Sequence, residues 1–117
     1  MKRNSESVWT YSKMISEARK HGVSEVYICR KNGADALSCV AGNRVEVVKG
    51  SVFAPVNDKF NAVKNFVQDY RRISIKAGHE VEGVSNIRIN FTTLAKAAQF
   101  VSASQSARAR DWKKIPV

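Results

Sequence analysis

Two stretches in the first two thirds of the chain carry apolar residues three and four positions apart, the spacing of a helix with one buried face. In residues 8–21 this stripe consists of Val8, Tyr11, Met14, Ile15 and Ala18. The second stretch follows a capping residue, Asn57 or Asp58, and ends before Gly78. Its stripe consists of Phe60, Val63, Phe66, Val67 and Tyr70. We expect both stretches to be helices whose stripes face the core.

The last third of the chain begins with a third helical pattern. Thr92 or Thr93 is placed to cap it, and it runs to about Ser102. Its inward face consists of Leu94, Ala97, Ala98 and Val101. The residues that follow are less regular, with a break at 104–106 and then a basic segment at 107–114. We expect that segment to be a short helix or irregular.

Between the helical stretches the pattern changes to that of strands. Residues 25–30, 35–40 and 44–49 are rich in β-branched and apolar residues, and Asn-Gly and Gly-Asn pairs separate them. Residues 87–91 alternate cleanly, with Arg88 and Asn90 on the open side, whereas 79–86 are polar and loop-like. The order of elements predicts an α+β fold, a small antiparallel β-meander with helices packed on one face.

Length and composition are typical of one globular domain. The chain has 117 residues, 44% of them hydrophobic, and no Pro-, Gly- or Ser-rich linker interrupts it, so we treat residues 1–117 as a single domain. No apolar run reaches the length of a membrane span, and the N-terminus does not resemble a signal peptide. Two cysteines, Cys29 and Cys39, are too few for a disulfide framework. We therefore expect a cytoplasmic protein with no membrane partner and with reduced cysteines.

No arrangement of residues indicates catalysis. The only histidines, His21 and His79, have no cysteine or acid at metal-ligand spacing. Glu80 and Glu82 stand in the polar stretch without a basic or nucleophilic partner in sequence, so solvated acids are expected there. The two cysteines are expected on neighbouring strands as small apolar residues. We predict no catalytic residue, no metal site and no cofactor, and thus a protein that is not an enzyme.

The charge is the feature that bears on function. Twenty Lys and Arg residues stand against ten Asp and Glu, giving a net charge of +10. Residues 83–117 are the most one-sided part, with six bases and a single acid, Asp111. A basic surface can simply aid solubility, but Lys and Arg beside phosphates release counterions and favour binding to a polyanion of any sequence. We therefore expect a nucleic acid as partner. The charge does not distinguish DNA from RNA, and of the two we favour DNA.

The residues predicted to contact nucleic acid come mainly from the basic segment around Trp112. They are Arg108, Arg110, Lys113 and Lys114, followed by Arg71, Arg72, Arg88 and Lys96. A tryptophan beside cations can stack on a base, so Trp112 is included among the candidates. The alternative is that its ring closes the end of the core. The two interpretations are compatible if the ring anchors the segment while the charges face outward.

Four pieces of the chain follow the order of a known domain. Residues 45–51 resemble its strand end f-x-V-x-K-G-S, and residues 70–78 its helix l-R-x-x-L-x-x-x-G. Residues 91–101 resemble its segment F-x-S-x-S-x-A-A-x-x-v, and Trp112-Lys113 its closing W-K. Residues 34–114 thus resemble the domain of unknown function at the C-terminal ends of GIY-YIG nucleases and restriction-associated proteins, and are similar to the RAMA module. The resemblance leaves residues 8–21 outside.

Two departures from that pattern concern the C-terminal third. Ala103 and Ala109 stand where the family usually has glycine, and Thr92 and Thr93 where serine is common. The resemblance implies a noncatalytic module that helps a nucleic-acid enzyme hold its substrate. The function expected from sequence is therefore a nucleic-acid-binding accessory module that contacts the phosphates of duplex DNA with little sequence preference. The alternative is a small basic inhibitor or adaptor that binds an acidic protein surface and modulates a nucleic-acid enzyme.

Overall fold

The structure is a computed structural model that describes Ser16, residues 25–56 and residues 65–115. The predicted helix at 8–21 lies outside the described residues except for Ser16, which is helical. The expected caps Asn57 and Asp58 and the stripe residues Phe60 and Val63 lie outside them as well.

Five strands form one antiparallel sheet in the order β6-β3-β2-β1-β7. The first three are β1 (Glu25–Cys29), β2 (Ala36–Ala41) and β3 (Arg44–Val47), which confirms the predicted meander. The edge strands are β6 (Ile89–Phe91) and β7 (Lys113–Ile115). A short 3-10 turn, η1 (Lys31–Gly33), joins β1 to β2, and Asn32 and Gly33 adopt positive φ there, as an Asn-Gly pair readily does.

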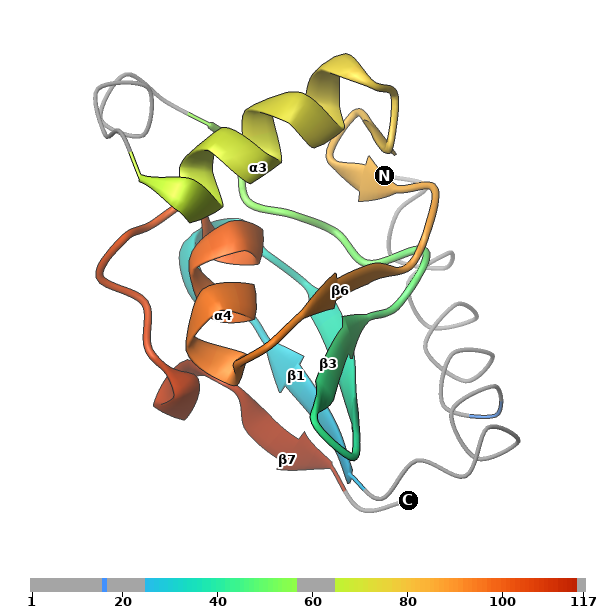
Figure 1. Ribbon diagram of the computed structural model, residues 1–117, viewed down its shortest axis with the longest axis vertical. Helices are drawn as coiled ribbons and strands as arrows, with labels where there is room; N and C mark the ends of the chain where they lie inside the picture. The colour runs from blue at the N-terminus through green and yellow to red at the C-terminus, as the bar shows by residue number, and fades with distance from the viewer. Residues whose placement is uncertain (1–15, 17–24, 57–64, 116–117) are drawn as a thin grey trace.

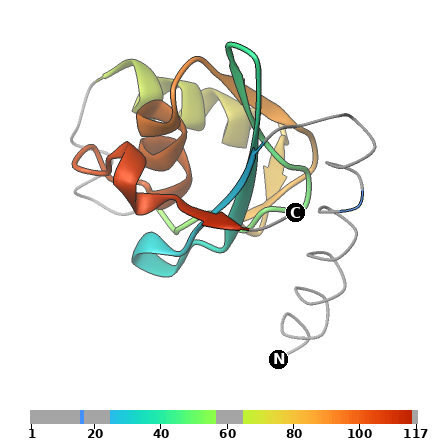
Figure 2. The same cartoon turned by 90° about the horizontal axis from the view of Figure 1, so that it is seen from below.

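Two helices lie on one face of this sheet (Figures 1 and 2). The first, α3 (Phe66–Lys76), is capped by Asn65, whose side chain accepts a hydrogen bond from the Gln68 amide. The second, α4 (Leu94–Ser102), is capped in the same way by Thr93 and ends at Ala103, which has a positive φ of 53°. This arrangement confirms the expected α+β class with helices on one face of a small antiparallel sheet.

A small second sheet replaces part of the loop expected at 79–86. Its two strands are β4 (Glu80–Val81) and β5 (Val84–Ser85), which pair antiparallel across a tight turn. The turn has Glu82 and Gly83 at positive φ. The expectation of an unstructured polar loop is therefore wrong, because the backbone pairs across the turn, with Val81 opposite Val84 and Glu80 opposite Ser85.

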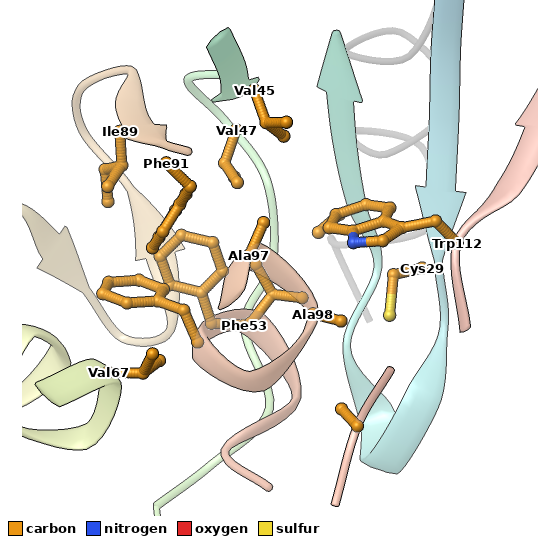
Figure 3. Close-up of a cluster of buried hydrophobic side chains, with 14 residues drawn as sticks. Cys29, Val45, Val47, Phe53, Val67, Ile89, Phe91, Ala97, Ala98 and Trp112 are labelled. Carbon is orange, nitrogen blue, oxygen red and sulfur yellow. The ribbon is translucent and has the colours of Figure 1, made fainter. Parts of the chain in front are cut away.

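The core lies between the sheet and the two helices, and α4 supplies much of it. Phe53, Tyr70, Phe91 and Phe100 pack edge to face, with ring centroids 5.1–5.6 Å apart. Figure 3 shows the buried cluster, with Ile89 and Phe91 at one end and Trp112 beside Cys29 at the other. A smaller buried cluster occupies the opposite face of the sheet and consists of Val26, Leu37 and Cys39.

The orientation of α3 differs from the sequence prediction. Its buried side chains are Val67, Gln68, Arg71 and Ser74. Phe66, predicted to lie in the core, is 70% exposed, and Ile73 on the same face is 64% exposed. The prediction for Phe66 is wrong because the helix is turned so that Arg71 faces inward, where it meets an acidic partner described below. Val67 is buried as expected.

Candidate nucleic-acid interface

Trp112 fixes the position of the basic C-terminal segment. Its side chain is 4% exposed, and its indole Nε1 donates a hydrogen bond to the Leu94 carbonyl at 2.9 Å. Buried in this way, the ring cannot stack on a base. Of the two interpretations of Trp112, the structure shows that it closes the core, and the base-stacking assignment is corrected.

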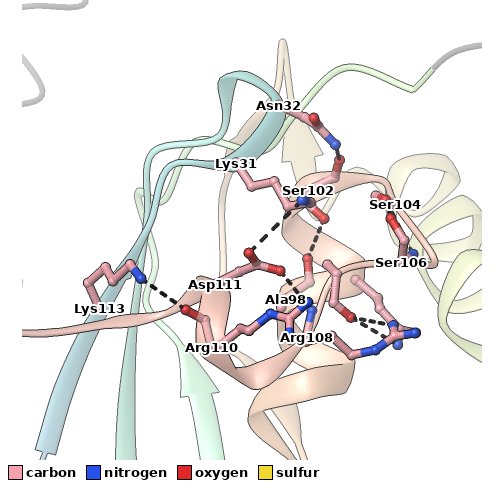
Figure 4. A network of polar contacts seen from close by, with 12 residues as sticks. Lys31, Asn32, Ala98, Ser102, Ser104, Ser106, Arg108, Arg110, Asp111 and Lys113 are labelled. Atoms are coloured by element: carbon pink, nitrogen blue, oxygen red, sulfur yellow. Dashed lines mark hydrogen bonds and ion pairs between the residues drawn. The ribbon is translucent and has the colours of Figure 1, made fainter.

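Three of the predicted contact residues lie around this anchor. Arg108 directly precedes the 3-10 turn η2 (Ala109–Asp111), Arg110 lies within it, and Lys113 is the first residue of β7. All three are exposed. The structure adds Lys31 from η1, whose Nζ lies 4.0 Å from Asp111 Oδ1. We refer to Lys31, Arg108, Arg110 and Lys113 as the C-terminal basic cluster (Figure 4).

Hydrogen bonds to backbone carbonyls hold two of the cluster's cations, Arg108 and Lys113, in place. Arg108 Nη1 donates to the carbonyls of Gln105 and Ala107, at 3.1 and 3.0 Å. Lys113 Nζ donates to the Arg110 carbonyl at 3.3 Å. Asp111 Oδ2 accepts from the Arg108 amide at 2.8 Å, so the carboxylate also holds the turn itself. Carbonyl oxygens orient a cation without cancelling its charge, and these bonds leave the cluster positive.

Successive side chains of β7 point to opposite faces of the sheet, so Lys114 points away from Lys113 and the rest of the cluster. Its Nζ lies 3.1 Å from Glu25 Oε2, and Glu25 Oε1 accepts a hydrogen bond from the Tyr27 hydroxyl. The hydrogen bond between them raises the pKa of Lys114 and lowers that of Glu25, to which the Tyr27 bond also contributes. The charge of Lys114 is thus balanced locally by a carboxylate.

Arg71 cannot contact nucleic acid, because it is 1% exposed. Its Nε and Nη2 donate to the two carboxylate oxygens of Glu80 at 2.9 and 3.0 Å, and Nη1 donates to the Phe100 carbonyl. The guanidinium also lies 5.4 Å from the Phe53 ring centroid. The expectation that Glu80 is a solvated acid without a basic partner is therefore wrong, since the partner is nine residues away in sequence. The pair borders an open pocket of about 410 Å³.

The remaining predicted residues lie at separate places. Arg72 pairs with Asp69 at 2.7 Å on α3. Lys96 lies with its Nζ 5.8 Å from the Phe66 ring centroid. Arg88 precedes β6 and lies 3.8 Å from Glu46. Because β6 and β7 are opposite edges of the sheet, four strand spacings of about 4.8 Å, roughly 19 Å in total, separate Arg88 from Lys113. The nine predicted residues do not form one surface.

Lys31 is the residue that sequence reasoning missed. It lies 80 positions before Asp111 in the chain, and it reaches the cluster only because η1 packs near α4 and η2. The side chain of Asn32 reinforces this contact by donating to the Ser102 carbonyl at 3.2 Å. No local pattern around Lys31 could have shown this.

The surroundings of the two cysteines do not indicate a catalytic or metal-binding role. Cys29 and Cys39 are free and buried, on the neighbouring strands β1 and β2 as predicted. Burial raises the pKa of both thiols, that of Cys39 to about 11, with a smaller contribution from the Glu46 carboxylate. Within residues 25–56 and 65–115, no group of three or more His, Cys, Asp or Glu side chains is arranged to hold a metal ion.

Comparison with known proteins identified no relative of this chain. No family model matches the chain, and searches of curated proteins and of solved structures gave no match either. In the part of the chain that the structure describes, no helix is long and apolar enough to cross a membrane.

Proposed function

We propose that this protein is a noncatalytic, cytoplasmic nucleic-acid-binding accessory module that contacts the phosphates of duplex DNA with little sequence preference. The observation that carries the proposal is the C-terminal basic cluster. Four cations from two segments distant in sequence lie on or beside a turn anchored by buried Trp112, and Asp111 in that turn pairs with Lys31 and accepts a hydrogen bond from the Arg108 amide. The resemblance of residues 34–114 to a nuclease-associated module agrees with this role.

The cluster suits phosphate contacts better than base reading. No helix long enough to fill a major groove presents it, and its cations sit on a turn and at the start of an edge strand. Contacts of this kind position a protein on the duplex but carry no sequence information. The affinity then comes mainly from counterion release, and nonspecific binding near 10⁻⁴ to 10⁻⁶ M is expected at physiological salt, to order of magnitude.

The test is the salt dependence of binding to a random-sequence duplex, measured by fluorescence anisotropy. Four phosphate contacts predict a slope of log affinity against log salt of about −3.6. The variant Arg108→Ala, Arg110→Ala, Lys113→Ala should bring the slope to about −0.9, because three contacts are lost. Its matched control is Arg44→Ala, Lys49→Ala, Arg88→Ala, which removes the same formal charge from the start of β3, the turn after it and the residue before β6.

Two outcomes would contradict the proposal. One is the absence of binding at about 50 mM salt and high micromolar protein, a condition under which a basic nonspecific binder is still bound. The other is an equal loss of slope in the cluster variant and its control, which would mean that net charge alone governs binding and that the cluster has no special role.

A further inference from the structure

One face of α3 exposes apolar side chains that the core does not use. Phe66 and Ile73 are 70% and 64% exposed, and they lie on the same side of the helix because seven residues make two turns. Tyr70 stands between them, partly buried, with its ring stacked on that of Phe66 at 6.2 Å. We call Phe66, Tyr70 and Ile73 the α3 stripe.

The inner face of the same helix is buried and mostly polar, since Val67 is its one fully apolar member beside Gln68, Arg71 and Ser74. Gln68, Arg71 and Ser74 are each 1% exposed, and Gln68 Oε1 and Ser74 Oγ have no hydrogen-bond partner among the residues that the structure describes. A helix that only had to cover a core would place its apolar residues inward. On its inner side α3 supplies Arg71 to the buried ion pair with Glu80. On its outer side it leaves Phe66 and Ile73 exposed to solvent, as a helix with a binding surface on that side does.

The charges around the stripe are mostly positive. Lys96 lies 5.8 Å from the Phe66 ring, Lys76 is exposed in the last turn of α3, and Arg72 pairs with Asp69. In the described part of the chain neither lysine is ion-paired, and Asp69 is already engaged by Arg72. A partner that fits this surface therefore combines an apolar ridge with flanking carboxylates.

The whole-chain charge decides against a second copy as the occupant. Two copies of a chain with a net charge of +10 repel each other, and a symmetric contact through the stripe would bring the flanking lysines of both copies into one interface. Ile73 argues against a nucleotide base, since it offers no ring for stacking. Apolar residues at positions i, i+4 and i+7 are the spacing that a helix presents to another helix.

We propose that the α3 stripe is the docking site for an amphipathic helix of a partner protein, with an apolar ridge that packs on Phe66 and Ile73 and acidic residues that face Lys76 and Lys96. The α3 stripe is then the binding surface for the alternative function, that of an adaptor that binds a partner protein. The three stripe residues all lie on α3, whereas the C-terminal basic cluster lies on η1, on and beside η2, and at the start of β7, so the two surfaces share no residue and can be mutated separately.

The probe is a synthetic helical peptide with leucines at i, i+4, i+7 and i+11 and glutamates on both flanks, labelled for anisotropy. A second peptide replaces each glutamate by lysine. The protein variants are Phe66→Gln and Ile73→Gln, which keep a good helix former in α3. The control is Val81→Gln, which changes another exposed apolar residue, on β4. Circular dichroism and a denaturant titration establish that each variant is folded.

The acidic peptide should bind the native protein, and each stripe variant should weaken that binding by about tenfold, as loss of an anchor side chain does. Val81→Gln should change it less than about twofold, and the lysine peptide should bind at least about tenfold more weakly. Absence of binding by the acidic peptide, or equal binding of both peptides, would overturn the proposal.

Two further results would assign the stripe to another occupant and also overturn the proposal. Concentration-dependent self-association of the native protein, abolished by Phe66→Gln, would identify a second copy. Amide shifts in α3 on addition of oligothymidylate, lost in Phe66→Gln, would identify an unpaired base. Both measurements can be interpreted whether or not the protein binds duplex DNA as proposed above.

Discussion

The indole N–H of Trp112 donates to the carbonyl of Leu94, 18 residues earlier, and so joins the C-terminal basic segment to the first turn of α4. The bond satisfies the only hydrogen-bonding group of the tryptophan side chain, and the ring packs in the cluster that also contains Cys29 and Ala98 (Figure 3). The basic cluster is therefore carried by a packed element rather than by a loose tail.

Truncation of this anchor should weaken both the fold and binding. Trp112→Ala removes a buried ring and should lower the free energy of unfolding by about 3–5 kcal/mol. Trp112→Phe keeps most of the ring and loses the hydrogen bond, so a smaller decrease is expected. A denaturant titration gives both values. Full stability of Trp112→Ala with a selective loss of single-stranded DNA binding would contradict the buried position.

Phe66 should matter little for stability. Since its ring is mostly in solvent, Phe66→Ala should change the free energy of unfolding by only about 0.5 kcal/mol or less. Phe100→Ala, in the centre of the same helix pair, should decrease it by about 3–5 kcal/mol. Both values come from urea unfolding followed by circular dichroism. A Phe66→Ala loss as large as that of Phe100→Ala would place Phe66 in the core after all.

The Arg71–Glu80 pair should show the behaviour of a buried ion pair. Arg71→Met leaves the Glu80 carboxylate buried without its partner and should lower the free energy of unfolding by about 3–5 kcal/mol. The double variant Arg71→Met, Glu80→Leu removes both charges and should recover most of that loss. Additive losses in the double variant would show that the two charges act separately. DNA binding by the folded double variant should equal that of the native protein.

Lys113 and Lys114 should differ in their contribution to DNA binding although they are adjacent. Lys113 belongs to the basic cluster, whereas Lys114 is paired with Glu25 on the other side of β7. Lys113→Ala should reduce the salt slope by about 0.9, the value for one phosphate contact, and Lys114→Ala should reduce it much less. Equal effects of the two substitutions would mean that the Glu25 pair opens on binding.

The cysteines should react slowly in the native protein. Because burial raises the pKa of Cys39 from its ordinary value of 9.0 to about 11, the neutral thiol predominates between pH 7 and 9 and the nucleophilic thiolate is scarce. Ionisation opposes folding for such a group, so stability is kept below about pH 9 and falls as the pH rises toward 11. Alkylation with iodoacetamide, followed by mass spectrometry, should show slow labelling that denaturant accelerates.

The amino-acid sequence by itself determined the elements whose stability is local. The strands at 25–30, 35–40 and 44–49 and the Asn-Gly turn between the first two appear where the pattern predicted them. Thr93 caps α4 as expected, because its hydroxyl reaches an amide only three residues away. Alternation along 87–91 likewise placed Arg88 and Asn90 on the open side.

Tertiary structure alone decided which residues come together at the candidate sites. The inward turn of α3 follows from Glu80 and the Phe100 carbonyl, which offset the desolvation of Arg71 and lie 9 and 29 residues away. Strand β7 pairs with β1 through backbone hydrogen bonds, for which lysines serve as well as valines. Lys31 likewise reaches Asp111, 80 residues later in the chain, only in the folded protein. Periodicity reports the environment of a residue only along its own element, so these long-range pairings, and with them the exposure of Phe66 and the burial of Trp112, became visible only in the folded chain.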